Sequence, residues 1–173
     1  MIIGFCGPIG AGKTTCARHL EASHGFRRVR FAGPLKDMLR ALGLTDEELD
    51  GHLKEQPCDL LGGQTPRRAM QTLGTEWGRA LIHPDLWVLA WLHAIKDYPQ
   101  VVVDDVRFPN EVETIRAAGG MVILVERPGF TAETTHPSES HRLRFDFTVR
   151  NDVPLETLHE RVDQMLELLD DPA

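Results

Sequence analysis

The 173-residue sequence lacks a long hydrophobic run and an excess of positive charge. No stretch approaches the roughly 20 apolar residues that cross a bilayer, and the opening MIIGFCG is too short an apolar segment for a secretion signal. The formal net charge of −7 gives no global attraction to a polyanion such as DNA. We therefore expect a protein that is not exported, binds no membrane and does not have nucleic acid as its default partner.

Cysteine is also scarce, since Cys6, Cys16 and Cys58 form neither a C-x-x-C pair nor an even set. Disulfide frameworks stabilise small secreted domains that bury too little apolar surface, whereas this chain is 42% hydrophobic and long enough for a sizeable core. The composition therefore predicts a cytoplasmic location and one domain over residues 1–173.

Apolar runs alternate with helical periodicity along the chain, which is typical of a parallel sheet covered by helices. We expect a three-layer α/β fold with a central five-stranded parallel sheet, and strands at residues 2–6, 28–31, 101–104, 121–125 and 145–149. Four prolines mark expected first turns of helices: Pro66, Pro84, Pro109 and Pro154. Residues 43–64 and 127–144 look irregular, and we interpret them as an acceptor-side insertion and a lid.

A glycine-rich pattern follows the first expected strand and precedes a helix. It has the form G-x-x-x-x-G-K-[ST], with Gly7, Gly12, Lys13 and Thr14 at the fixed positions. In such a loop the backbone N–H groups surround phosphate oxygens, the lysine adds a positive charge and the hydroxyl holds Mg²⁺. The predicted ATP site consists of Gly7, Gly10, Ala11, Gly12, Lys13, Thr14 and Thr15.

Two carboxylates and an arginine follow the expected strand at residues 101–104, in the stretch VVVDDVRFPNE. In doubly wound sheets the ligand lies beyond the carboxyl ends of the strands, so Asp104, Asp105 and Arg107 are expected near the loop. An arginine there can stabilise the charge that spreads over a phosphoryl group during transfer. We favour Asp104 for the metal and Asp105 for the acceptor phosphate, although either aspartate could meet the metal. The alternative is that Asp105 caps a helix and Arg107 is its surface partner.

The stretch QTPRRAMQTLGTEWGRALI predicts a helix from Pro66 with two glycines in its interior. Each costs roughly 0.5–1 kcal/mol relative to alanine, so a partner is expected to approach closely. That partner is either a nucleotide, held by Arg67 or Arg68 and by Gln71, or another helix. We expect Trp77 and Trp87 to be core residues. A polar segment from Arg127 onward suits a lid that excludes water, with Arg127 as its first catalytic candidate.

Several segments together resemble a known family, namely FAGPLKDML, MQTLGTEWGR, DLW, DDVRFPNE and HPSE. They resemble the deoxynucleoside monophosphate kinases of tailed bacteriophages, within the superfamily of P-loop nucleoside monophosphate kinases. The resemblance implies transfer of the ATP γ-phosphate to a deoxynucleoside 5′-monophosphate, with Mg²⁺, in the cytoplasm of an infected bacterium. It is compatible with a homodimer. Residues 42–64 match no family pattern, which leaves the base selectivity open.

The resemblance also assigns substrate-binding residues: Lys36, Arg67 or Arg68, Gln71, Thr75, Asp105, Arg107 and Glu111. Lys13, Arg107, Asp105 and Arg127 are the catalytic candidates, and Thr14 and Asp104 are the metal candidates. Two alternatives remain at this point. One is another small-molecule kinase of the same fold, such as a dephospho-coenzyme A kinase, which shares the final strand-to-helix turn FDFTVRND. The other is a noncatalytic nucleotide switch or a nucleic-acid-associated ATPase.

Overall fold

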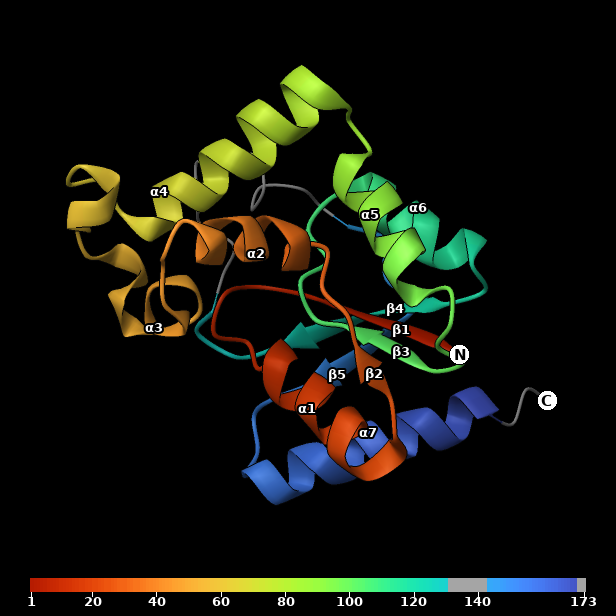
Figure 1. Ribbon diagram of the computed structural model, residues 1–173. Helices are drawn as coiled ribbons and strands as arrows, with labels where there is room; N and C mark the ends of the chain where they lie inside the picture. The colour runs from red at the N-terminus through yellow and green to blue at the C-terminus, as the bar shows by residue number, and fades with distance from the viewer. Residues whose placement is uncertain (131–142, 171–173) are drawn as a thin grey trace. The chain divides into compact units, whose positions relative to one another are not determined.

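Five parallel strands form one sheet in the computed structural model, which describes residues 1–130 and 143–170 (Figure 1). The strands are β1 (Ile2–Cys6), β2 (Arg27–Arg28), β3 (Val101–Val103), β4 (Met121–Glu126) and β5 (Phe147–Arg150). Their order is β2-β3-β1-β4-β5, so β1 lies at the centre. The predicted parallel α/β sheet of five strands flanked by helices is confirmed.

The strand boundaries follow the prediction closely for β1 and less closely at the edges of the sheet. β2 has two residues rather than four and starts one residue earlier. β5 starts two residues later than predicted. Before it, the side-chain carboxylate of Asp146, rather than a backbone carbonyl, accepts the hydrogen bond from the backbone N–H of Val122, with 2.8 Å between Oδ2 and N. Strand β3 ends at Val103, so Asp104 directly follows the strand rather than belonging to it.

Two compact units divide the chain. The first, called the sheet unit, comprises Met1–Arg30 and Ile95–Ala173, and the second, called the helical unit, comprises Phe31–Ala94. The division is one of compactness, and the single domain expected over residues 1–173 stays a prediction. In the described part of the chain, no helix combines the length and apolarity that crossing a membrane requires.

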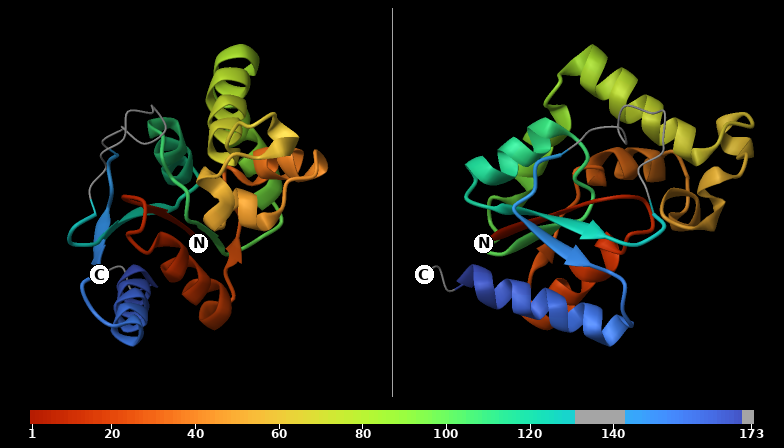
Figure 2. Two further views of the ribbon diagram at one scale, coloured as in Figure 1. Left: turned by 90° about the vertical axis from the view of Figure 1, so that its left-hand side faces the viewer. Right: turned by 180° about the vertical axis from the view of Figure 1, so that it is seen from behind.

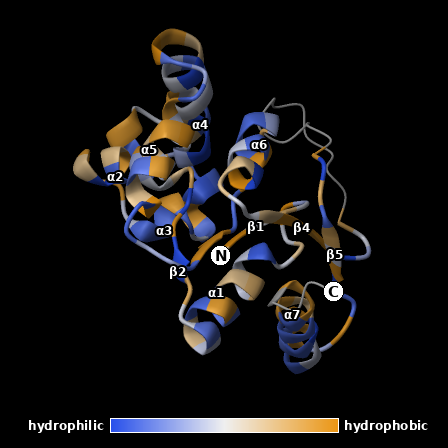
Figure 3. Cartoon of the chain, turned by 90° about the vertical axis from the view of Figure 1, so that its right-hand side faces the viewer, coloured by the Kyte–Doolittle hydropathy of each residue, from blue (hydrophilic) through white to orange (hydrophobic). Residues whose placement is uncertain are grey.

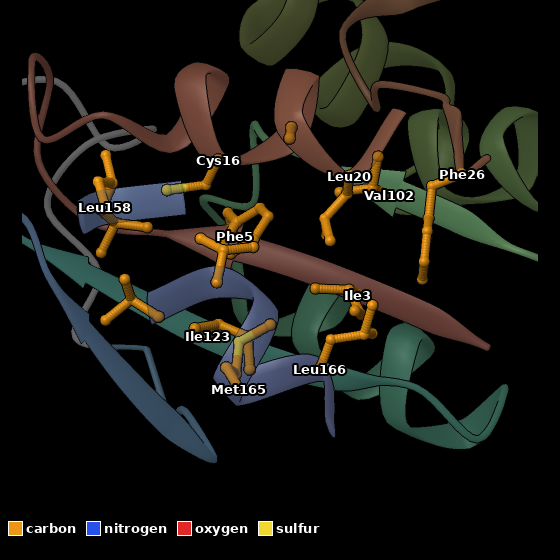
Figure 4. Close-up of a cluster of buried hydrophobic side chains, with 14 of the residues drawn as sticks. Ile3, Phe5, Cys16, Leu20, Phe26, Val102, Ile123, Leu158, Met165 and Leu166 are labelled. Atoms are coloured by element: carbon orange, nitrogen blue, oxygen red, sulfur yellow. The ribbon is translucent and has the colours of Figure 1, made fainter. Parts of the chain in front are cut away.

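Helices cover both faces of the sheet in the sheet unit. Figure 2 shows α1 (Lys13–His24) and α7 (Leu155–Asp170) on one face and α6 (Pro109–Ala117) on the other. Figure 4 shows the core between the sheet and the first pair, where Phe5 and Ile123 point toward Leu158 and Met165. The polar side of α7 faces away from the sheet (Figure 3), whereas Leu158, Val162 and Met165 of the same helix lie in the core.

The helical unit consists of helices that precede β3 in the chain. They are α2 (Gly33–Ala41), α3 (Asp46–Leu49), η1 (His52–Glu55), η2 (Asp59–Leu61), α4 (Pro66–Gln71), η3 (Thr72–Ile82) and α5 (Leu86–Ile95), whose last residue belongs to the sheet unit. Residues 43–64 therefore hold three helices of three or four residues each, so the segment is less irregular than expected. Its role as an acceptor-side insertion stays a prediction. Thr45 and Glu48 cap α3 reciprocally, which explains why so short a helix forms there. Helix α5 begins two residues after Pro84.

The helix predicted from Pro66 changes type within its length, since η3 is a π-helix. Both interior glycines are buried, and their neighbour is a tryptophan of α5. A Cβ atom at Gly78 would lie 2.6 Å from a ring carbon of Trp87, and Trp87 Nε1 donates a hydrogen bond to the carbonyl of Gly74 (2.7 Å). The close partner of the glycines is therefore another helix. Trp87 is a core residue as predicted, whereas Trp77 is 37% exposed and the prediction for it is wrong.

Candidate active site

The carboxyl ends of β3, β1 and β4 place the phosphate-binding loop between an acidic and a basic segment. The three strands are neighbours and parallel, so the residues that follow them emerge at one edge of the sheet. The loop follows β1, Asp104 follows β3, and Arg127 follows β4. The sheet order thus brings together the donor-side residues that the sequence predicted separately.

Backbone conformation in the loop depends on glycine. Gly7, Gly10 and Gly12 have φ values of 130°, 79° and 105°, a region that other residues rarely adopt. Gly12 directly precedes α1 and has no side chain with which to cap the first turn of that helix. The first N–H groups of a helix have no partner within the helix, so they suit an anion, and the helix dipole favours negative charge there.

Lys13 bridges the loop. Its Nζ donates to the carbonyl oxygens of Gly7 and Pro8, each at 2.7 Å. Burial, and next the positive charge of Arg107, lower the pKa of Lys13 to about 8. The desolvated ammonium is held by two weak acceptors, so phosphate oxygens would be much stronger partners for it.

Thr14 and Asp104 form the contact that the predicted metal site requires. Thr14 Oγ1 donates to Asp104 Oδ2 at 2.6 Å, although the two residues are 90 positions apart. The side chain of Asp104 is 2% exposed. A hydroxyl and a carboxylate are the hard oxygen donors that Mg²⁺ prefers, so these two residues fit a nucleotide-bound Mg²⁺ ion.

Arg28 is a partner of Asp104 that the sequence did not reveal. Arg28 Nε donates to Asp104 Oδ1 at 3.1 Å and Arg28 Nη2 donates to Oδ2 at 2.7 Å, which makes a bidentate ion pair. Burial would raise the pKa of Asp104, but the hydrogen bonds from Arg28 and Thr14 and the positive charges of Arg28 and Arg30 hold it below its usual range. The Asp104 carboxylate is therefore ionised at neutral pH although its side chain is buried.

Glu111 organises the segment that carries Arg107. Its Oε2 accepts hydrogen bonds from the backbone N–H groups of Arg107 (2.7 Å) and Phe108 (3.0 Å), and the residue is 2% exposed. These contacts fix the backbone at the N-terminus of α6, where Asp105 and Arg107 leave the sheet. A direct role for Glu111 in substrate binding stays a prediction.

Two further residues contact the loop from the neighbouring strands. Arg127 Nη1 donates to the carbonyl of Gly10 (3.2 Å), and its guanidinium lies over the ring of Phe130 at 4.8 Å. Asn151, which follows β5, donates from Nδ2 to the carbonyl of Ala11 (2.7 Å). Sequence reasoning missed Asn151. Its position just after an expected strand was a usable signal, because ligands of parallel sheets bind at the carboxyl ends of the strands. Residues 131–142 of the predicted lid lie outside the described residues.

The acceptor candidates of the helical unit are basic or polar and belong to different helices. Lys36 of α2 is 7% exposed and forms an ion pair with Asp50. Arg67 of α4 is half-buried and forms an ion pair with Glu55, whereas Arg68 is exposed. Gln71 and Thr75 are half-buried on the continuous helix α4 and η3. These residues stay predicted substrate ligands.

The fold and this site define a class of protein, the P-loop kinase fold. A solved shikimate kinase of Bacteroides thetaiotaomicron matches with a TM-score of 0.53 at 13% identity and 99% coverage of both chains. The shikimate kinase of Aquifex aeolicus matches with a TM-score of 0.51 at 14% identity and 98% coverage of both chains. At these identities the likeness concerns the fold alone.

Sequence comparison identifies the family. Residues 62–162 match the family model of deoxynucleotide monophosphate kinase. A protein of Acanthamoeba polyphaga mimivirus with the provisional name deoxynucleotide monophosphate kinase is 35% identical, with 94% of each chain covered. The deoxynucleoside-5′-monophosphate kinase of Escherichia phage T5 is 41% identical over 44% of this chain and 34% of its own length. The chain belongs to the deoxynucleotide monophosphate kinase family.

Proposed function

We propose that the chain transfers the γ-phosphate of ATP to a deoxynucleoside 5′-monophosphate, which yields the diphosphate. The observation that carries the proposal is the contact of Thr14 with Asp104 beside the phosphate-binding loop, in a chain of this family. The relatives named above are viral, so we place the reaction in the cytoplasm of an infected host cell.

The sheet unit would bind the phosphate donor. Lys13 exchanges its two carbonyl partners for phosphate oxygens, and the N–H groups at the start of α1 surround the same phosphates. Mg²⁺, when bound at Thr14 and near Asp104, supplies positive charge to the β- and γ-phosphates. Arg28 keeps the Asp104 carboxylate oriented toward Thr14.

Positioning and charge neutralisation would supply the catalysis. Arg107 neutralises the phosphoryl oxygens so that two anions can approach, and Glu111 holds the backbone that presents it. The acceptor phosphate is itself anionic, so transfer needs neither a protein nucleophile nor a strong general base. Arg127, already bonded to the loop, is suited to stabilise the transferring group and to help exclude water.

The acceptor would be bound by residues of the helical unit. Arg67 or Arg68 would pair with its phosphate, Lys36 would add a second positive charge, and the base and sugar would meet Gln71 and Thr75. Lys36 pairs with the carboxylate of Asp50 and Arg67 with that of Glu55. An acceptor phosphate would compete with those carboxylates for Lys36 and Arg67. Replacement of either basic residue should therefore weaken binding of the acceptor. Asp105 stays a predicted acceptor ligand of the sheet unit.

The comparisons do not favour the two alternatives. The matched family model and relatives carry deoxynucleotide monophosphate kinase names, which speak against a dephospho-coenzyme A kinase. A noncatalytic switch or a nucleic-acid-associated ATPase would bind or slowly hydrolyse ATP without stimulation by an acceptor. The acceptor dependence of ADP formation therefore separates all three functions.

The test measures ADP release from ATP and Mg²⁺ by the purified protein. Each deoxy- and ribonucleoside monophosphate is offered singly, beside dephospho-coenzyme A and single-stranded DNA. Lys13→Ala is the inactive variant, and Lys96→Ala, at an exposed lysine of the sheet unit, is the matched control. We expect stimulation by deoxynucleoside monophosphates in the wild type and in Lys96→Ala, lost in Lys13→Ala. A flat response to the nucleotides would contradict the proposal.

A further inference from the structure

A second cluster of reactive side chains lies far from the phosphate-binding loop. His19 and His24 of α1 both direct Nε2 at the same carboxylate oxygen, Oδ1 of Asp163 on α7, at 2.6 and 2.7 Å. Figures 1 and 2 show α1 and α7 side by side. Helix α1 begins at Lys13, so His19 lies about 9 Å and His24 about 16 Å along the helix from the loop.

The donor atoms of this cluster suit a transition metal. Two imidazole nitrogens and one carboxylate oxygen lie within 4.8 Å of one another. Ligand atoms around a tetrahedral zinc ion are about 3.3 Å apart, as bond lengths near 2.0 Å require, so only small side-chain rotations are needed. Imidazole selects zinc-type metals over Mg²⁺, which keeps this cluster chemically distinct from Thr14 and Asp104.

The surroundings support the same interpretation. The side chains of His19, His24 and Asp163 are 11%, 31% and 40% exposed, so the group is partly buried yet open to an entering ion. The ring of His159 stacks on His19 with centroids 4.1 Å apart, which holds the imidazole plane. Ser23 Oγ lies 3.5 Å from His19 Nδ1, where it can accept a hydrogen bond from the N–H group that a metal-bound imidazole keeps at that nitrogen.

We propose that His19, His24 and Asp163 bind one divalent transition-metal ion of the zinc type, with water completing the coordination. The ion joins α7 to the helix that carries the phosphate-binding loop. Its ligands come from residues about 140 positions apart in the chain, so it stabilises the folded sheet unit rather than taking part in phosphoryl transfer. The proposal is independent of the proposed kinase activity.

The first test is metal binding by the full-length protein after removal of metals with a chelator. Equilibrium dialysis against micromolar Zn²⁺, in millimolar Mg²⁺, counts the bound ions, and a Co²⁺ titration reports tetrahedral coordination by its visible absorption. His24→Gln and Asp163→Asn each remove one ligand. His52→Gln is the matched control, because His52 contacts a single carboxylate, that of Glu47, at 2.9 Å.

We expect His24→Gln and Asp163→Asn to bind one zinc ion fewer per chain than the wild type, or to bind it at least about tenfold more weakly. His52→Gln should bind as the wild type does. Zn²⁺ should raise the melting temperature of the wild type and of His52→Gln, and much less that of the other two variants. Equal zinc binding by all four proteins, or a melting temperature that zinc does not raise, would overturn the proposal.

Discussion

The contact between Gly78 and Trp87 allows one stability prediction to be worked out in detail. A Cβ atom at Gly78 would lie 2.6 Å from one ring carbon of Trp87 and 2.8 Å from its Nε1. The ring is 4% exposed, and its N–H donates to the carbonyl of Gly74, so the ring cannot move aside without leaving a buried donor unpaired. Gly78→Ala is therefore expected to overpack the helical unit.

The magnitude follows from two opposing contributions. Overpacking a close contact costs about 1–3 kcal/mol, whereas replacing a helical glycine by alanine gains about 0.5–1 kcal/mol. The centres of these ranges leave a net loss of about 1 kcal/mol, which lowers the melting temperature by about 2–4 °C in a chain of this length. Gly74→Ala is the matched variant, because its Cβ atom would lie 3.4 Å from Leu35, an ordinary contact. It should gain about 0.5–1 kcal/mol.

Urea denaturation and thermal melting of the two variants beside the wild type measure both effects. A double-mutant cycle with Trp87→Phe identifies the cause, because the loss at Gly78 should shrink when the indole is replaced by a smaller ring. The reasoning is refuted if Gly78→Ala is as stable as the wild type, or if Gly74→Ala loses as much as Gly78→Ala does.

The remaining predictions concern the sheet unit and the one half-buried cysteine. Arg28→Met removes the guanidinium partner of the buried Asp104 carboxylate and should cost about 3–5 kcal/mol in urea denaturation, whereas Arg150→Met, at an exposed ion pair, should cost less than about 1 kcal/mol. The pKa of Lys13 is lowered from 10.5 in the unfolded chain to about 8 in the folded chain. Between about pH 8 and 10.5 the unfolded chain therefore binds a proton that the folded chain lacks, so Lys13 makes the free energy of unfolding rise with pH in this range. ATP binding should weaken above about pH 8 as Lys13 loses its charge, and denaturation and nucleotide titrations of Lys13→Met should show neither trend. Iodoacetamide should modify Cys58 alone in the folded protein, because burial raises the pKa of the other two cysteines to about 11 and about 12; mass spectrometry showing more than one adduct per chain would contradict this.

Local patterns predicted the position of the glycine-rich loop between a strand and a helix. The phosphate-binding loop is defined by neighbouring residues, and the apolar strand before it and the helix after it are equally local. Asp104 could be placed beside the loop because parallel strands end at one edge of a sheet. The contact of Thr14 with Asp104 confirms that expectation.

Long-range partners could not be predicted in the same way. The pair of Arg28 with Asp104 depends on the register of β2 against β3, where Arg28 aligns with Val102, and no local spacing encodes it. The packing of Trp87 on Gly78 depends on how the chain turns before α5. The glycines signalled a close approach correctly, but a single sequence does not distinguish a tryptophan from a nucleotide as the partner.

The central claim is tested most directly by following the phosphoryl group itself. ATP labelled in the γ-phosphate is incubated with the protein, Mg²⁺ and each deoxynucleoside monophosphate in turn, and the labelled products are separated by chromatography. Our account predicts label in the deoxynucleoside diphosphate in the wild type, and its loss in Lys13→Ala. Label that appears only as inorganic phosphate, with every acceptor present, would contradict it.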